Sequence, residues 1–317
     1  MLDEYYFIWM IGLMQVLNIP VPRLLVAIIT QARLSIRENQ KNGKPGTGCI
    51  LINELPDYHI HTSFCGHAGG TLEEYVLAAK ELGLPEMGFA DHLPLFHLED
   101  PSLAMSHTDL PLYIEQVQEL QRAYPDFPVR LGIEADYIGA HADDVARVLA
   151  RYGFDYVYGS VHFIGGWGID QSRFKFEFGR RDINEVYEMY FGLVMEAART
   201  GLFDIMTHLD VVKKYGHRPT ADLKPLYNRV AETLSKSRVA IELNSSGLHK
   251  PVEEIYPSLQ ILKIMREHGV PITFGSDSHK PSHVARAFDQ LLSHAKSAGY
   301  TDYVGFASRQ MIPRPLP

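Results

Sequence analysis

Cysteine is nearly absent from this sequence. The 317 residues include two cysteines, Cys49 and Cys65, which are too few for a disulfide framework, and a chain of this length does not need one to form a core. The composition, with 46% hydrophobic and 21% charged residues, is that of a globular protein and excludes a disordered one. These features predict a folded protein of the reducing cytoplasm.

Positive charge is also scarce. The formal net charge is -8 and the pI is near 6.0, so the surface as a whole will not attract a nucleic acid backbone. The sequence has no G-x-G-x-x-G after its first predicted strand and no G-x-x-x-x-G-K-[ST], the loops that hold dinucleotides and nucleoside triphosphates. We therefore expect no long nucleic acid partner, and any recognition of phosphate must be local.

Long hydrophobic runs are missing as well. The apolar stretches 5–17 and 24–29 are separated by prolines, and each falls short of the ~18 residues that a spanning helix needs. The first residues are acidic rather than basic, which argues against a secretory signal. Three interpretations stay open: a short helical extension packed on the main domain, a membrane-surface anchor, or upstream sequence foreign to the natural protein.

A polar, glycine-rich segment, 38–48, predicts a linker after these apolar stretches. We therefore divide the chain into an N-terminal extension, residues 1–54, and a main domain, residues 55–317.

Short β-rich runs alternate with amphipathic segments through the main domain. Thr71–Leu82 is typical of a helix, with Thr71 as N-cap and Gly83 ending it, and Asn184–Thr200 and Pro257–Glu267 are similar. Strands are predicted over Asp57–His61, Glu86–Ala90, Val129–Glu134, Asp155–Val161, Phe203–Thr207, Val239–Leu243 and Ile272–Gly275. This order predicts an α/β fold, a distorted parallel (β/α)7 barrel, with a doubly wound open sheet as the alternative.

Six of the seven predicted strands end in histidine or acidic residues. His59 and His61 share one side of the first strand, because residues i and i+2 of a strand point the same way. The others are His67, just after that strand, and then Asp91, His92, Glu134, Asp136, His162, His208, Asp210, Asp277 and His279. The carboxyl ends of parallel barrel strands meet at one face, where barrel active sites are built. The pattern therefore predicts a metal cluster rather than isolated histidines that cap strands.

Nine of these side chains are candidate metal ligands: His59, His61, His67, His92, Glu134, His162, His208, Asp277 and His279. One catalytic zinc ion takes three protein ligands, so nine suit two or three ions, with Glu134 as a plausible bridge. Mixed imidazole and carboxylate ligands favour Zn, Mn or Fe over Ca or Mg. Paired ions activate water and neutralise the oxygens of a phosphate ester, which indicates a metal-dependent phosphoesterase.

This series of residues resembles the PHP (polymerase and histidinol phosphatase) family, most closely its histidinol-phosphate phosphatases. The run Ser160-Val161-His162-Phe163 and the segment 242–257 are similar to that branch, and the resemblance begins at about Leu55. It implies a (β/α)7 barrel with three metal ions. One departure is His249, where similar enzymes often carry arginine.

The resemblance also implies how the nine ligands are shared. The first ion would take His59, His61, Glu134 and Asp277. The second would share Glu134 and add His162 and His208. The third would take His67, His92 and His279.

Further residues are candidates for catalysis and substrate binding. Three aspartates could supply the general acid or orient metal-bound histidines: Asp91, Asp136 and Asp210. Four basic residues could contact phosphate: Arg180, Arg181, Lys213 and Lys250. The glycine-rich loop 163–170 is expected to cover the substrate, with Trp167 lying against an imidazole ring.

The function that we expect from the resemblance is hydrolysis of L-histidinol phosphate to L-histidinol and phosphate, a step of histidine biosynthesis. A phosphoesterase acting on a nucleotide or another small ester is the first alternative. A metal-binding or membrane-associated regulatory module is an alternative from another class, although the complete set of ligands argues against it. A metallohydrolase of amides or lactones is the last, but no lysine at a strand end suits it.

Overall fold

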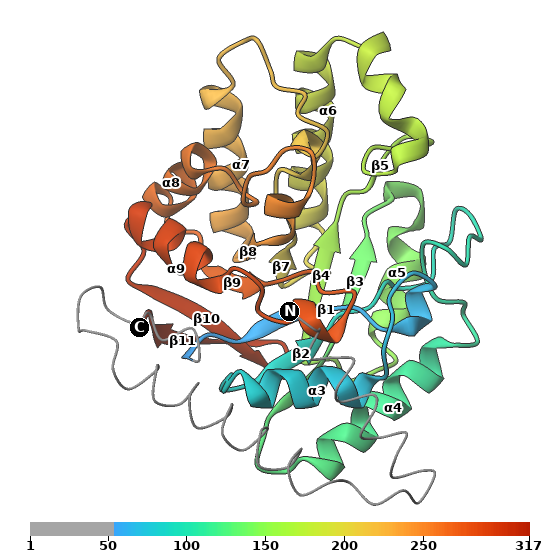
Figure 1. The fold of residues 1–317 in the computed structure, drawn as a ribbon. Helices are drawn as coiled ribbons and strands as arrows, with labels where there is room; N and C mark the ends of the chain where they lie inside the picture. The colour runs from blue at the N-terminus through green and yellow to red at the C-terminus, as the bar shows by residue number, and fades with distance from the viewer. Residues whose placement is uncertain (1–53) are drawn as a thin grey trace, which may run out of the picture. The chain divides into compact units, whose positions relative to one another are not determined.

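Seven parallel strands in the part of the chain that the computed structural model describes, residues 54–317, form one sheet in the order in which they occur in the sequence (Figure 1). They are β1 (Asp57–Ile60), β2 (Met87–Phe89), β3 (Val129–Asp136), β4 (Tyr156–Ser160), β7 (Ile205–Met206), β8 (Ala240–Asn244) and β9 (Ile272–Gly275). All neighbouring pairs are parallel. The predictions made for the apolar stretches and the linker lie outside the described residues.

The sheet curves until its last strand returns to its first. The N–H of His61 donates to the carbonyl oxygen of Ser278 at 2.8 Å, and the N–H of Ser278 donates to the carbonyl oxygen of His59 at 3.0 Å. These bonds join β1 to the loop after β9 and nearly close the barrel. The predicted distorted (β/α)7 barrel is therefore confirmed. The doubly wound alternative is wrong, because the strand order never reverses.

A helix follows each of the seven strands of the sheet, and these helices cover its outside (Figure 1). They are α3 (Leu72–Glu81), α4 (Leu110–Ala123), α5 (Ala142–Leu149), α6 (Ile183–Arg199), α7 (Lys224–Ser237), α8 (Leu259–Glu267) and α9 (Phe288–Ser297). The first begins as predicted, because the Thr71 side chain accepts from the N–H of Glu74 while the Glu74 carboxylate accepts from the N–H of Thr71. No helix of residues 54–317 has the length and apolar character needed to cross a bilayer.

Tyrosines fill the interior of the barrel where neighbouring strands provide glycine. Tyr156 is fully buried, and its hydroxyl donates to the carbonyl oxygen of Tyr58 at 2.6 Å. A Cβ on Gly88 or Gly132 would lie 2.2 or 2.3 Å from the Tyr156 side chain, so only glycine fits at these positions.

An antiparallel hairpin, β10 (Asp302–Ala307) and β11 (Gln310–Pro315), packs at the amino ends of the strands. The backbone N–H of Ser308 donates to the side chain of Asp155, just before β4, at 3.0 Å. Glu86, just before β2, pairs with Arg314 of the hairpin at 2.8 Å. The opposite end, at the carboxyl ends of the strands, carries the ionisable residues.

Candidate metal centre

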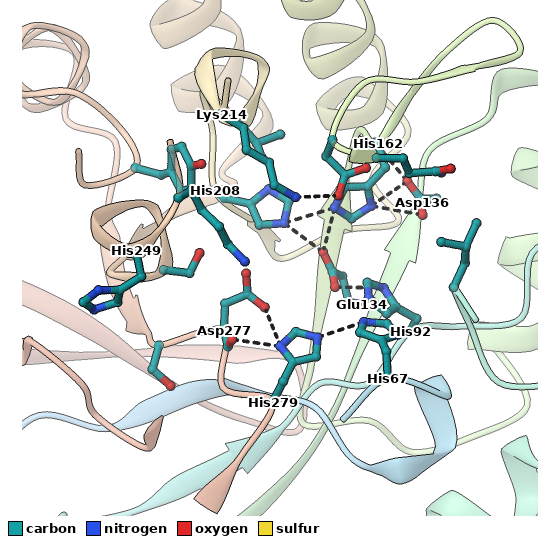
Figure 2. Close-up of a pocket in the computed structure, with 18 of the residues that line it drawn as sticks. His67, His92, Glu134, Asp136, His162, His208, Lys214, His249, Asp277 and His279 are labelled. Atoms are coloured by element: carbon teal, nitrogen blue, oxygen red, sulfur yellow. Dashed lines mark hydrogen bonds and ion pairs between the residues drawn. The ribbon is translucent and has the colours of Figure 1, made fainter. Parts of the chain in front are cut away.

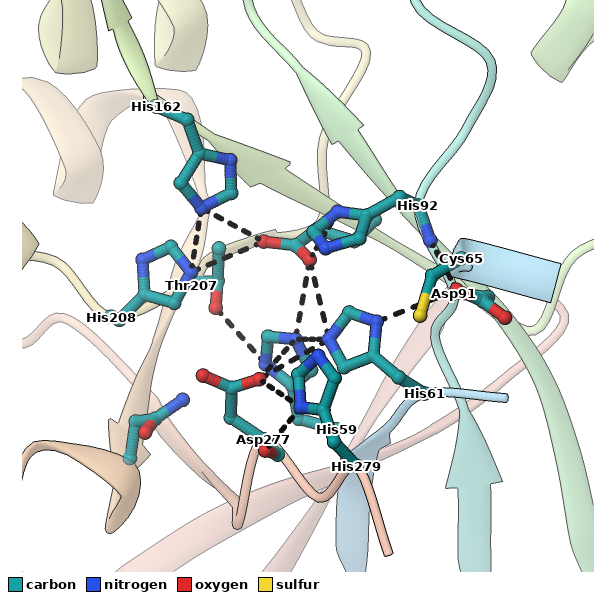
Figure 3. A network of polar contacts seen from close by, with 12 residues as sticks. His59, His61, Cys65, Asp91, His92, His162, Thr207, His208, Asp277 and His279 are labelled. Carbon is teal, nitrogen blue, oxygen red and sulfur yellow. Dashed lines mark hydrogen bonds and ion pairs between the residues drawn. The ribbon is translucent and has the colours of Figure 1, made fainter. Parts of the chain in front are cut away.

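The nine predicted ligands gather at the carboxyl ends of the strands (Figures 2 and 3). Most of them are buried, and His59, His61 and Glu134 are each at most 1% exposed. Burying ionisable groups so completely is costly unless they are paired or bind a cation, so their mutual geometry decides what the site can do.

The first implied set consists of His59, His61, Glu134 and Asp277. The Nε2 atoms of His59 and His61 lie 3.0 Å apart, and Glu134 Oε2 lies 3.4 and 3.6 Å from them. Asp277 Oδ1 is 3.2 Å from His61 Nε2 and 4.0 Å from His59 Nε2. Four ligand atoms thus face one small volume.

The second implied set lies on the other side of the same carboxylate. Glu134 Oε1 is 3.1 Å from His208 Nε2 and 3.7 Å from His162 Nε2, and the two imidazole nitrogens are 3.2 Å apart. The two oxygens of Glu134 therefore face different sets of histidines, which is the arrangement that a bridging ligand requires.

The third implied set is more open. His67 Nε2 and His279 Nε2 are 2.9 Å apart. His92 lies within reach of His279 and also of the first set, because ligand atoms of His61, His92 and His279 all lie within 4.8 Å of one another. His92 Nδ1 is in addition 3.0 Å from Glu134 Oε2.

The pair formed by His67 and His279 tests whether a cation fits. Burial lowers the pKa of both rings, that of His279 to about 3, so both are neutral at pH 7. The Nδ1 of His67 bonds the carbonyl oxygen of Cys65, and the Nδ1 of His279 bonds that of Asp277, so each Nδ1 carries the proton. Both Nε2 atoms then present lone pairs to each other, which a metal ion between them would relieve.

Distances within the sets agree with this. Two ligand atoms bound at about 2.0–2.1 Å to one ion, about 90–110° apart, are separated by about 3 Å. The three nitrogen pairs, at 2.9, 3.0 and 3.2 Å, meet that requirement. Glu134 Oε2 has no hydrogen-bond partner within residues 54–317, although His92 approaches it closely. The residues therefore fit a cluster of divalent transition-metal ions.

The carboxylates of the centre favour positive charge. Burial opposes ionisation of Glu134, but the charges of His92 and His59 outweigh it and hold its pKa well below the usual range. Burial likewise opposes protonation of His59, yet Glu242 and Glu134 raise the pKa of that imidazole well above its ordinary value. A metal cation at this position would replace the protons that the carboxylates attract.

Glu242 of β8 orients the first ligand. Its Oε1 accepts from His59 Nδ1 at 2.7 Å, and its Oε2 accepts from the Thr207 hydroxyl and from the N–H of His208. A Cβ on Gly275 would lie 1.9 Å from Glu242 Oε1 and 2.6 Å from the Cβ of His59, so glycine allows this approach. The sixth strand, for which the sequence predicted no ligand, thus supplies the carboxylate behind His59.

Two predicted aspartates have similar roles. Asp91 is fully buried, lies 3.5 Å from His61 Nδ1 and accepts from the N–H of Thr62 at 3.0 Å. Asp136 accepts from the backbone N–H of His162 at 3.0 Å and from its Nδ1 at 3.1 Å. Both carboxylates hold an imidazole in place, and Asp136 also lines the cavity described next.

The residues of the candidate metal centre form the floor of a cavity of about 510 Å³. Basic residues from the loops after β8 and β9 line one wall: His249, Lys250, His283 and Arg286. Lys214 lies on the side of His162 and His208 (Figure 2), and Asp170, which pairs with it, also lines the cavity. A cavity of this volume suits a small substrate.

Comparison with known proteins places this architecture in a family. Residues 57–246, more than half of the chain, match the PHP domain. The chain belongs to the PHP domain family. A probable histidinol-phosphatase of Deinococcus radiodurans is 39% identical over 261 residues, covering 82% of this chain and 99% of that protein. The histidinol-phosphatase of Bacillus subtilis is 27% identical over 264 residues, covering 74% and 97%.

Two solved PHP structures have the same fold. A histidinol phosphatase structure from Listeria monocytogenes has a TM-score of 0.67 at 25% identity, covering 74% of this chain and 99% of that one. The histidinol phosphate phosphatase of Lactococcus lactis, a complex with zinc, L-histidinol and phosphate, has a TM-score of 0.71 at 21% identity, covering 82% and 99%.

Of the residues predicted to contact the substrate, only some line the cavity of this PHP domain. Lys250 lines it. Arg180 and Arg181 lie outside it and pair with Glu177, each at 3.1 Å. Trp167 is buried, has Arg181 4.9 Å from the centre of its ring and does not line the cavity, so its contact with the imidazole ring of a substrate stays a prediction.

Lys213 also lies outside the cavity, and its charge is neutralised by carboxylates in the protein interior. Its buried ammonium group is 2.9 Å from Asp210 Oδ2 and 3.0 Å from Glu254 Oε2, and donates to the carbonyl oxygen of Ile255. Asp210 is equally buried, accepts from the N–H of Ser258 and does not line the cavity. A role for Asp210 as the general acid stays a prediction.

Sequence analysis missed Lys214 and Asp170, which do line the cavity and pair at 3.2 Å. It also missed Arg286 and His283. Lys214 directly follows Lys213, and Asp170 ends the loop expected to cover the substrate, so both were near residues already singled out.

Proposed function

We propose that this protein is a metal-dependent phosphomonoesterase that hydrolyses L-histidinol phosphate to L-histidinol and phosphate, as a step of histidine biosynthesis. The observation that carries the proposal is Glu134, whose two oxygens face two separate sets of histidines at the floor of a small cavity. A relative 39% identical over nearly its whole length is named a probable histidinol-phosphatase, which supports the substrate.

The nine predicted ligands would hold two or three ions of zinc, manganese or iron, in the sets given above. Such ions lower the pKa of a bound water to near neutral and neutralise phosphate oxygens. The protein itself orients the imidazoles through Glu242, Asp91 and Asp136, and ligands at the floor of the site are almost fully buried. Lys250 and its basic neighbours on the cavity wall would attract the phosphate.

Asp91 and Asp210 are positioning residues in this proposal. Asp91 orients His61, and Asp210 holds Lys213 and the N–H of Ser258. The scarcity of cysteine supports a cytoplasmic location.

The test is phosphate release by the purified protein supplied with Zn or Mn. L-Histidinol phosphate is compared with a panel of nucleoside monophosphates and p-nitrophenyl phosphate, with and without a chelator. We expect the highest kcat/KM on L-histidinol phosphate and loss of all activity with the chelator. Comparable rates on every ester would defeat the substrate assignment, and activity that resists complete metal removal would defeat the mechanism.

A further inference from the structure

Four carboxylates line the cavity: Glu134, Asp136, Asp170 and Asp277. Glu134 and Asp277 belong to the candidate metal centre. Asp136 is engaged with His162, which approaches both of its oxygens through Nδ1 at 3.1 and 3.2 Å. Asp170 is the carboxylate of this group that neither joins the centre nor orients one of its histidines.

The fold places Asp170 beside the second set of ligands. A two-stranded hairpin, β5 (Phe163–Ile164) and β6 (Trp167–Gly168), leaves His162 and returns to it, because the N–H of Ile169 donates to the carbonyl oxygen of His162 at 2.9 Å. The next residue is Asp170. Its own carbonyl oxygen accepts from the Tyr215 hydroxyl at 2.6 Å, which fixes the backbone from the other side.

The side chain of Asp170 is held by one oxygen. Lys214 Nζ lies 3.2 Å from Oδ2, and the two side chains are 18% and 25% exposed. Within residues 54–317, Oδ1 makes no hydrogen bond. An ionised carboxylate has about four acceptor positions. Asp170 therefore retains capacity for a second cationic partner on the cavity side.

The substrate class of the proposed function supplies such a partner. In L-histidinol phosphate the amine is attached to the carbon next to the one that bears the phosphate ester. Only two carbon atoms separate the ester oxygen from the ammonium nitrogen, so an ammonium group must lie close to any phosphate bound at the metal centre. The carboxylates of the centre itself would already be occupied by metal.

We propose that Asp170 accepts the ammonium group of the substrate and so selects phosphate esters of vicinal amino alcohols over esters that lack the amine. The inference rests on the proposed function and names the residue that provides its specificity. Lys214 occupies only one oxygen of the carboxylate, and the backbone contacts on either side of Asp170 hold the acceptor in place without it.

The experiment compares two esters that differ by the amine alone, L-histidinol phosphate and 3-(imidazol-4-yl)propyl phosphate, on the metal-loaded protein. The variants are Asp170→Asn and Lys214→Met, which break the same ion pair from opposite sides. Asp204→Asn is the matched control, because Asp204 pairs with Arg309 at the far end of the barrel with similar burial. Calorimetric binding of L-histidinol and of 3-(imidazol-4-yl)propan-1-ol gives a readout independent of turnover.

We expect Asp170→Asn to lower kcat/KM for L-histidinol phosphate by about 10- to 100-fold, the effect of one hydrogen bond between charged groups, and to leave the ester without the amine little changed. L-Histidinol should bind more weakly to the same variant by a similar factor. Lys214→Met and Asp204→Asn should retain the discrimination between the two esters.

Equal losses on both esters in Asp170→Asn, or the same loss of discrimination in Lys214→Met, would show that the ion pair is structural and would overturn the inference alone. Failure of the wild-type protein on L-histidinol phosphate, with turnover of other esters, would overturn the proposed function and the inference with it.

Discussion

Glu86 and Glu134 lie at opposite ends of the same barrel, and each is 1% exposed. Around Glu86, at the amino ends of the strands, every close polar partner is a donor or a cation. The Tyr58 hydroxyl donates to it at 2.6 Å, and Arg130 and Arg314 each approach to 2.8 Å. This carboxylate is satisfied by the protein alone, which is what a buried charge in a structural role requires.

Glu134, at the carboxyl ends, has the same burial and a different environment. Five imidazoles surround it, His92 at 3.0 Å being the nearest, and its Oε2 has no hydrogen-bond partner in the described part of the chain. The histidines also crowd one another nitrogen to nitrogen. The two carboxylates are equally buried, but only Glu86 has donors or cations of the protein at both oxygens. At the amino ends the protein alone therefore neutralises its buried carboxylate, whereas at the carboxyl ends the arrangement suits bound cations.

The two ends also differ in why residues other than glycine adopt a positive φ. At the amino ends, Ser308 and Arg309 have φ of 49° and 64° because they form the two-residue turn between β10 and β11, which requires such angles. At the carboxyl ends, His208 and Asp277 have φ of 22° and 53° without a hairpin to explain them. Strain of this kind persists where it positions functional side chains, and both residues are candidate ligands.

Replacing the shared ligand should produce the largest effect. We expect Glu134→Gln to lower kcat/KM on the order of a thousandfold or more, because two sets of ligands lose the same negative charge. Elemental analysis should find fewer bound ions. Glu86→Gln is the matched control and should retain most of the activity and its full metal content. Equal activity in the two variants would remove the distinction between the two ends.

Removing an orienting carboxylate should have a smaller effect. Glu242→Gln leaves the ligands in place but weakens the hold on His59 and His208, so we expect metal affinity to fall about 10- to 100-fold, measured by competition with a chromophoric chelator. Glu254→Gln breaks contacts to Lys213 and Arg218 without touching an imidazole, and serves as the control. An affinity unchanged in Glu242→Gln would mean that the fold fixes His59 by itself.

The features that could be predicted from the sequence are those that depend on short local patterns of residues. The strands are short apolar runs, and six of the seven end in a histidine or an acid, so the seven strands and the convergence of the nine candidate ligands followed from pattern. Their binding of metal stays a prediction. The hairpin of β10 and β11 was not predicted, because Pro313 and Pro315 disfavour a strand. The strand β11 accommodates both prolines because β10 is its one partner, so its other edge needs no hydrogen bonds to a neighbouring strand.

Side-chain direction in irregular segments could not be predicted in this way. Lys213 and Lys214 are adjacent at the end of a 3-10 turn, Val211–Lys213, where successive side chains point about 120° apart. One ammonium group therefore enters the protein interior and the other enters the cavity. Arg180 and Arg181 do not line the cavity, and Glu177, one turn earlier, pairs with both, which the sequence pattern alone did not indicate. Glu242 was missed as a functional residue because it lies inside a strand that looked purely structural.

The effect of Glu86→Gln on stability is the next prediction. Glutamine cannot neutralise Arg130 and Arg314, so the free energy of unfolding should fall by about 1–3 kcal/mol. Urea denaturation of the metal-free and the metal-loaded protein would measure it. The loss should be the same in both states, since Glu86 has no contact with the candidate metal centre, and a loss seen only with metal would contradict the separation of the two ends.

The ion pair between Asp204 and Arg309 should have the smallest effect on the free energy of unfolding. Arg309 is 33% exposed, so water screens the pair, and its second nitrogen also donates to the carbonyl oxygen of Leu202 at 2.7 Å. In a double-mutant cycle with Asp204→Asn and Arg309→Met we expect a coupling free energy of about 0.2–1 kcal/mol that declines with added salt. A coupling of several kcal/mol would mean that the hairpin end depends on its charges as strongly as the candidate metal centre depends on Glu134. The amino end of the barrel would then not be the passive scaffold that its fully paired charges indicate.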